Sequence, residues 1–210
     1  SEEFEKKICE YTGAKYCVVV SNATAALHLT CLALGLEKND FLWTSPISFV
    51  ASSNCGLYCG AQVDFVDIDP TSYNLSVEKF ETKLLSASQK PKIVIPVHFS
   101  GFSCDMEKIS QLSRKHNIKI IEDASHAMGA DYNGSKVGSC EFSDACVFSF
   151  HPVKIMTTAE GGAITTNNLE LFQKLKMLRS HGITKDPNLM IKKDAVSYTH
   201  LRAHETGRNL

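Results

Sequence analysis

The sequence contains no long hydrophobic run and no excess of either charge. Among its 210 residues, no stretch approaches the ~20 apolar residues that a membrane-spanning helix needs. Lys and Arg number 22 against 23 Asp and Glu, so the formal net charge is −1, and no basic run is present. This balance argues against nucleic acid or an anionic membrane as the main partner. The hydrophobic share of 43% is ordinary for a globular protein.

The motifs that usually mark nucleotide and metal sites are also missing. There is no GxGxxG and no GxxxxGK[ST] pattern, which removes the main support for a dinucleotide-binding or P-loop enzyme. No two of the eight cysteines have the two-residue spacing common in zinc sites, so no metal site is predicted. Several cysteines lie inside apolar runs such as ACVFSF, as small buried hydrophobes would. Because no other feature of the sequence indicates secretion, the predicted location is the reducing cytoplasm.

Helical and strand-like periods alternate through most of the chain. Helices are predicted at residues 4–11, 23–35, 48–60, 77–88, 106–116 and 169–182, and strands at 16–21, 41–46, 62–68, 92–100, 118–125, 144–150 and 161–166. A polar, hairpin-like region is expected at 131–138. The apolar run in KIVIPVHFS is typical of a strand that is covered on both faces. The alternation predicts an α/β domain with a mainly parallel sheet and helices on both faces.

Ligands of open α/β sheets bind at the carboxyl ends of the strands, and four predicted strand ends here carry polar or special residues. In SNATAAL, residues 21–27, small side chains, the amides of a helix start and the Thr24 hydroxyl could bind a phosphate. Simple helix capping by Ser21 or Asn22 is the other interpretation. In TSPISFV, Phe49 could lie over a flat ring or belong to the core.

The other two strand ends carry charged side chains. In IIEDASHA, a buried carboxylate would need a positive partner such as a protonated pyridine nitrogen, unless it forms a structural ion pair or caps the next turn. In FSFHPVKIMTTAEGGAITTN, residues 148–167, Lys154 lies in a loop between two strands. Desolvation there would lower the pKa of its amine and free a nucleophile, although a lone loop lysine is usually solvated. Together the four features match what pyridoxal 5′-phosphate (PLP) requires.

These segments resemble the DegT-type sugar aminotransferases, a branch of the fold-type I PLP enzymes. The resemblance rests on SNATAALHL, TSPISFVAS, VDIDP, PVHFSG, IIEDASHAMGA and FSFHPVKIMTTAEGGAITTN, which occur in colinear order. It implies the large domain of that fold, a three-layer α/β/α sandwich with a mainly parallel sheet. It also implies that Lys154 forms the Schiff base with PLP and shuttles protons at the sugar. Asp123 would pair with the pyridine nitrogen, and His126 would lie beside the ring. Phe49 would stack on the ring face, and the phosphate would be held by the other cofactor-binding residues, Ala23, Thr24, Ala25 and Ser149.

The branch that these motifs resemble most transfers an amino group from glutamate to C4 of a UDP-linked 4-keto-6-deoxy-N-acetyl sugar. The resemblance therefore implies a nucleotide-sugar substrate, glutamate as amino donor and a homodimer for the full-length enzyme. Transfer to a different nucleotide-linked keto sugar is an alternative, because SNATAAL and TTAEGG are only moderately specific. Relatives that perform dehydration replace the lysine by histidine, so Lys154 argues for transfer. A catalytically silent domain that binds a nucleotide sugar or a protein partner is the remaining alternative.

The resemblance covers roughly residues 1–190, which are predicted to form the PLP-binding large domain. Family members are considerably longer, so an N-terminal lead and a C-terminal small domain are expected to be missing. The chain begins at Ser1 rather than Met, and its acidic first residues do not look like a signal peptide. Residues 191–210 are predicted to be a disordered or foreign tail. In the family the partner subunit reaches into the cofactor site from regions absent here, so this chain is expected to be inactive alone.

Overall fold

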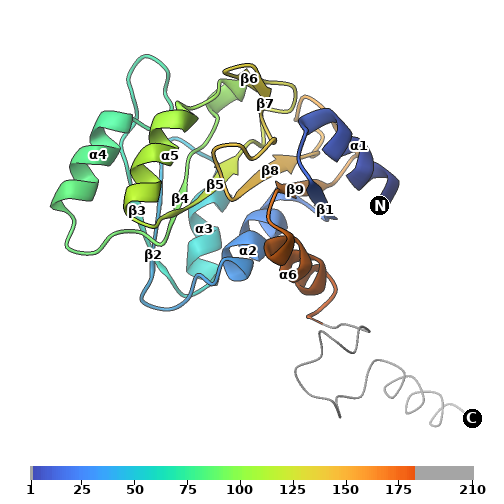
Figure 1. The fold of residues 1–210 in the computed structure, drawn as a ribbon, viewed down its shortest axis with the longest axis horizontal. Coiled ribbons are helices and arrows are strands. Elements are labelled where there is room, and N and C mark those ends of the chain that lie inside the picture. The colour runs from blue at the N-terminus through green and yellow to red at the C-terminus, as the bar shows by residue number, and fades with distance from the viewer. Residues whose placement is uncertain (1, 183–210) are drawn as a thin grey trace, which may run out of the picture.

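The computed structural model describes residues 2–182 and shows a seven-stranded sheet between two layers of helices (Figure 1). The strand order is β1-β9-β8-β5-β4-β2-β3. These strands are β1 (Tyr16–Val20), β2 (Phe41–Thr44), β3 (Gln62–Phe65), β4 (Ile93–Ile95), β5 (Lys119–Asp123), β8 (Ala145–Ser149) and β9 (Gly162–Thr166). Five neighbouring strands of this order pair in parallel, namely β8, β5, β4, β2 and β3. In contrast, β9 is antiparallel to both β8 and β1. The predicted α/β fold with a mainly parallel sheet is therefore confirmed, and β9 is the reversed strand of this sheet.

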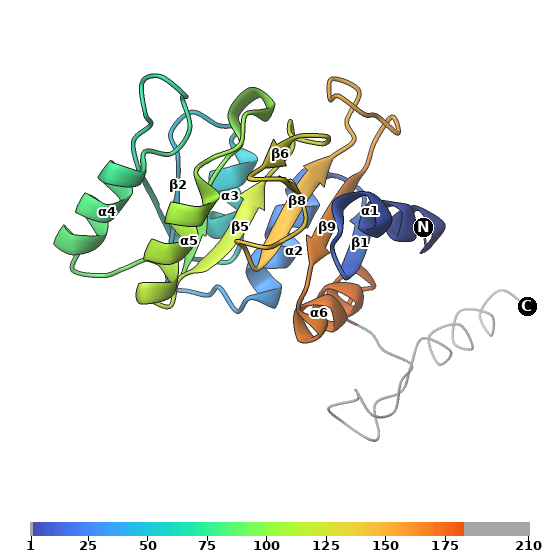
Figure 2. The ribbon, with the colours of Figure 1, turned by 45° about the horizontal axis from the view of Figure 1, so that its top comes forward.

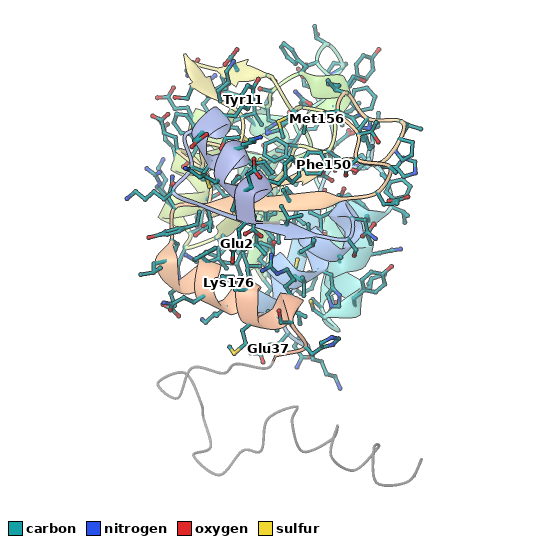
Figure 3. The ribbon with its side chains drawn as sticks, turned by 90° about the vertical axis from the view of Figure 1, so that its right-hand side faces the viewer. Glu2, Tyr11, Glu37, Phe150, Met156 and Lys176 are labelled. Carbon is teal, nitrogen blue, oxygen red and sulfur yellow. The ribbon has the colours of Figure 1, made fainter. Side chains whose placement is uncertain are left out.

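The helices cover both faces of the sheet. One layer contains α2 (Ala23–Ala33), α3 (Ala51–Tyr58) and α6 (Leu169–Arg179), and the other contains α1 (Glu2–Thr12), α4 (Val77–Ser86) and α5 (Met106–Lys115) (Figure 2). Figure 3 looks along the sheet from its β1 side and shows α1 and α6 on opposite faces. The remaining elements are the 3₁₀ turn η1 (Phe99–Gly101) and the hairpin of β6 (Asp131–Tyr132) and β7 (Ser135–Lys136).

Successive residues of the central strands pack into different layers. In β5, Ile121 joins the core under α2 and α3, whereas Ile120 joins the core under α4 and α5. In β8, Val147 joins the core under α2 and α3, whereas Phe148 joins the cluster that contains Ile8 of α1, and the whole strand is buried. Burial on both faces is the reason these strands are apolar throughout instead of alternating.

Several predicted elements are shorter in the structure, and two of them differ most. Residues 92–100 were expected to form one strand, but β4 ends at Ile95. Pro96 comes next, and because proline has no N–H to donate, it ends the regular ladder. Its carbonyl accepts the Asp123 amide at 2.9 Å, and the chain then turns through η1. The predicted helix at 48–60 begins only at Ala51 and ends at Tyr58.

No helix within residues 2–182 is long and apolar enough to cross a bilayer. The predicted tail at 191–210 lies outside the described residues, as does the last part of the predicted large domain, 183–190.

Candidate active site

A cavity of about 530 Å³ opens at the edge of the sheet where β1, β2, β4, β5 and β8 end. Its lining contains seven of the eight predicted site residues, namely Ala23, Thr24, Phe49, Asp123, His126, Ser149 and Lys154. The loop between β8 and β9, which carries Lys154, rises above this edge in Figure 2. The structure thus brings the four polar strand ends of the sequence together in one place.

The start of α2 presents backbone amides to the cavity. The side chain of Asn22 caps the helix by accepting the Ala25 amide at 2.8 Å, and its carbonyl accepts the Ala26 amide at 3.1 Å. The amides of Ala23 and Thr24 precede that turn, and the first amides of a helix have no partner within it. Together with the helix dipole they suit a phosphate group. Helix capping by Asn22 therefore does not exclude the predicted phosphate site, which stays a prediction. Ala25 was expected to hold the phosphate, but its amide is used by the cap and it does not line the cavity.

Gly162 allows β9 to approach the start of α2. A Cβ at this position would lie 2.5 Å from the Asn22 carbonyl carbon and 2.7 Å from the Ala23 nitrogen. Both atoms belong to the backbone, so they could not move aside without displacing the helix start. The second glycine of the TTAEGGA segment is therefore a packing requirement of the predicted phosphate site.

Asp123 is a buried carboxylate at the carboxyl end of β5, and only 4% of its surface is exposed. Its Oδ1 accepts hydrogen bonds from the hydroxyl of Ser125 at 2.6 Å and from the Ser125 amide at 3.1 Å. Its Oδ2 accepts one from the hydroxyl of Ser52 at 2.6 Å. These donors stabilise the negative charge away from water, but none of them is itself charged. The carboxylate is therefore suited to a positively charged group that enters the cavity.

The amine of Lys154 lies 2.6 Å from Nε2 of His126. Desolvation lowers the pKa of Lys154 below its usual value, and the negative charge of Asp123 acts in the opposite direction. The pKa of His126 is lowered as well, first by desolvation and then by the charge of Lys154. A neutral imidazole can accept a hydrogen bond from the ammonium group, so His126 holds the amine at the cavity. The predicted contact of His126 with the cofactor ring stays a prediction.

The backbone of the β8–β9 loop is closed at its base. The Phe150 amide donates to the Gly161 carbonyl at 2.9 Å, and the Thr158 amide donates to the Phe150 carbonyl at 3.0 Å. Within the loop, the Lys154 amide donates to the His151 carbonyl at 2.9 Å. These bonds give the lysine a defined backbone position between two buried strands.

Phe49 is not a core residue, because 72% of its surface is exposed while it lines the cavity. An exposed aromatic ring at a cavity can stack on a flat ligand, so the structure favours that interpretation of TSPISFV. Ser149 also lines the cavity, at the end of β8, and its hydroxyl accepts the His151 amide at 3.4 Å.

Sequence reasoning missed Ser48, Ser52, Ser125 and His98. Ser52 contacts Asp123 across 71 positions of the chain, a contact that no local pattern signals. His98 is buried, and its Nδ1 accepts the Cys104 amide at 3.1 Å while Nε2 lies 2.8 Å from Glu122. Glu122 and Asp123 point to opposite faces of β5 because side chains alternate along a strand. Glu122 therefore forms the structural pair, which leaves Asp123 for the cavity.

The lowered pKa of Lys154 makes a prediction about its reactivity. A lower pKa means that the unprotonated amine exists at a lower pH, so Lys154 should react with an amine reagent at lower pH than an ordinary lysine does. The measurement is labelling by limiting reagent across a pH series, with Lys154 quantified by peptide mass mapping and N-acetyl-lysine amide as internal reference. A half-maximal labelling pH equal to that of the reference would contradict the predicted desolvation of the amine.

Residues 1–201 match the model of the DegT/DnrJ/EryC1/StrS aminotransferase family. The chain belongs to this family. A UDP-4-amino-4,6-dideoxy-N-acetyl-β-L-altrosamine transaminase from Campylobacter jejuni is 47% identical over 184 residues, which are 88% of this chain and 48% of the relative. Among solved structures, Helicobacter pylori PseC, an aminotransferase involved in the biosynthesis of pseudaminic acid, has a TM-score of 0.81 and 36% identity. That match covers 94% of this chain and 52% of PseC.

A second solved member shows the cofactor of the family. NtdA from Bacillus subtilis, solved with its cofactor PMP, has a TM-score of 0.80 and 30% identity, over 93% of this chain and 42% of NtdA. Enzymes of the DegT/DnrJ/EryC1/StrS family are PLP-dependent aminotransferases, so the predicted family, fold type and cofactor class are confirmed. The chain spans about half the length of the relatives that it matches.

Proposed function

We propose that this chain is the cofactor-binding part of a sugar aminotransferase that acts in pseudaminic acid biosynthesis. The reaction would transfer an amino group from L-glutamate to C4 of a UDP-linked 4-keto-6-deoxy-N-acetylhexosamine. The observation that carries the proposal is the convergence of Lys154, Asp123 and the start of α2 on one cavity. The similarity to the Campylobacter jejuni transaminase and to PseC supports the choice of sugar.

The residues of the cavity fit the cofactor group by group. PLP, when bound, withdraws electrons from the reacting carbon and carries the amino group. Asp123 would hold the protonated ring nitrogen, and Phe49 would lie against the ring. The phosphate would be bound by the α2 amides of Ala23 and Thr24 together with the hydroxyl of Ser149.

Lys154 would hold the cofactor covalently and move a proton at the reacting carbon. Its lowered pKa suits both roles, because the unprotonated amine is the form that attacks a carbonyl and accepts a proton. His126 would keep the amine within reach of the cavity through their hydrogen bond. Retention of this lysine and of a carboxylate free to pair with a ring nitrogen favours an active enzyme over a silent binding domain.

We also expect the full-length enzyme to be a homodimer whose partner subunit covers the cavity. Three exposed apolar side chains line the cavity, namely Ile47, Phe49 and Val153. Their neighbours in the sequence, Val50, Ile155 and Met156, are exposed as well. A cytoplasmic location stays a prediction, and the eight cysteines, all of which are free, are compatible with it.

The test is an amino-transfer assay with PLP, L-glutamate and the UDP-linked 4-keto sugar, in which the amino sugar is detected by mass spectrometry. We expect product from a chain extended to the length of its relatives, none from the same chain with Lys154→Ala, and none from residues 1–210 alone. A GDP-linked 4-keto sugar serves as the competing substrate. Preference for it would overturn the proposed sugar but leave the aminotransferase in place, whereas no transfer to either would overturn both.

A further inference from the structure

Two serines outside the predicted site form a chain of hydroxyl groups that ends on Asp123. Ser52 lies in the first turn of α3, is completely buried, and has its Oγ 2.6 Å from Oδ2 of Asp123. The hydroxyl of Ser48, which lines the cavity, lies 2.6 Å from the hydroxyl of Ser52. The order along the chain of contacts is Ser48, Ser52, Asp123.

The direction of the hydrogen bonds in this chain follows from the charge at its end. An ionised carboxylate can only accept, so Ser52 must donate its single hydroxyl hydrogen to Asp123. Ser52 then has no hydrogen left for Ser48, so Ser48 is the donor in this 2.6 Å contact, which is shorter than its 3.1 Å contact with the Phe49 carbonyl. Each hydroxyl thus polarises the next toward the negative charge, and hydrogen bonds in such a chain strengthen one another.

Ser52 differs in its partner from other buried hydroxyls of the described chain. Thr12, Thr30 and Thr44 each donate to a backbone carbonyl, the usual way to satisfy a hydroxyl inside a helix or a sheet. Ser52 neither caps α3 nor donates to the preceding turn of the helix. Its hydrogen-bonding capacity goes to Ser48 and Asp123, two residues that line the cavity.

We propose that Ser52, supported by Ser48, is a positioning residue that keeps the carboxylate of Asp123 fixed in orientation for the protonated ring nitrogen of the cofactor. This inference rests on the proposed function, because it needs a cofactor with such a nitrogen. Ser125 holds Oδ1 and Ser52 holds Oδ2, so the carboxylate cannot rotate without losing a charge-assisted bond. Loss of the Ser52 donor frees Oδ2 to move, so the carboxylate would stabilise the protonated ring nitrogen less well.

The test uses the 210-residue chain with PLP labelled with ¹⁵N in the ring, because the ¹⁵N chemical shift reports whether the ring nitrogen is protonated. We expect Ser52→Ala to move this shift toward the unprotonated value and to weaken PLP binding about ten-fold, as loss of a bond to a charged group would. Ser53→Ala is the matched control, since Ser53 is the next residue of α3 and its hydroxyl donates to the Val50 carbonyl. It should leave both the shift and the affinity unchanged.

Ser48→Ala decides the question if Ser52→Ala does not fold, because Ser48 lies outside the helix and is only half-buried. It should move the ¹⁵N shift in the same direction by a smaller amount. The positioning role alone would be overturned if the ¹⁵N shift were the same in Ser52→Ala and Ser53→Ala. If Ser52→Ala does not fold, an unchanged ¹⁵N shift in Ser48→Ala would overturn it. Failure of the unmutated chain to bind PLP, also when it is extended to the length of its relatives, would instead count against the proposed function.

Discussion

Replacement of Lys154 by alanine is expected to abolish covalent attachment of PLP to the chain. Among residues 2–182, Lys154 is the only lysine that lines the cavity, and its lowered pKa favours the nucleophilic form of the amine. The measurement is borohydride reduction after incubation with PLP, followed by peptide mass mapping. The unmutated chain should carry one phosphopyridoxyl group on the peptide that contains Lys154, and the variant should carry none above background.

Lys174→Ala is the matched control for this experiment. Lys174 lies on α6 and forms a surface ion pair with Glu170 at 2.8 Å, and it does not line the cavity. Its removal should leave labelling of Lys154 unchanged. Equal total labelling of the unmutated chain and Lys154→Ala would mean that PLP reacts with surface amines at random, and the assignment of this lysine would then be wrong.

Glu122→Ala is expected to lower the free energy of unfolding by about 3 kcal/mol, a large share of the stability of an ordinary domain. Glu122 accepts hydrogen bonds from the buried His98 and from Ser143. Alanine would remove the acceptor for both, and a buried polar group without a partner costs more than a hydrogen bond contributes. Glu122→Gln keeps an oxygen for His98 and an amide for Ser143, so its cost should be about 1 kcal/mol.

Urea unfolding measures both changes, and Glu141→Ala provides the control. Glu141 is exposed and also accepts a hydrogen bond from a serine, Ser135, so the same type of contact is tested on the surface. Its removal should change the free energy of unfolding by no more than about 0.5 kcal/mol. A Glu122→Ala variant as stable as Glu141→Ala would show that the buried pair does not stabilise the fold.

Local patterns predicted the order and type of most elements well. Periodicity placed the helices that became α2, α4, α5 and α6, and Ser76 and Asp105 cap α4 and α5 by accepting amides of their own helices. These features depend on residues within a few positions of one another. Periodicity was least accurate where a proline or a turn interrupts an apolar run, as after β4, because apolar residues continue there after the ladder has ended.

The sequence by itself determined which residues are candidates for the site, because Lys154, Asp123 and SNATAAL belong to recognisable motifs at strand ends. It left each with two interpretations, and the observations that bear on them are burial and contacts between residues far apart in the chain, which only the tertiary structure shows. Exposure of Phe49 removed the core interpretation, and the His98–Glu122 pair separated the two adjacent carboxylates. The Ser48–Ser52–Asp123 chain could not be predicted, because a serine in a helix has the same local signature whether its hydroxyl faces a carbonyl or a distant carboxylate. Only the parallel packing of β2 and β5, with β4 between them, brings those groups within hydrogen-bonding distance.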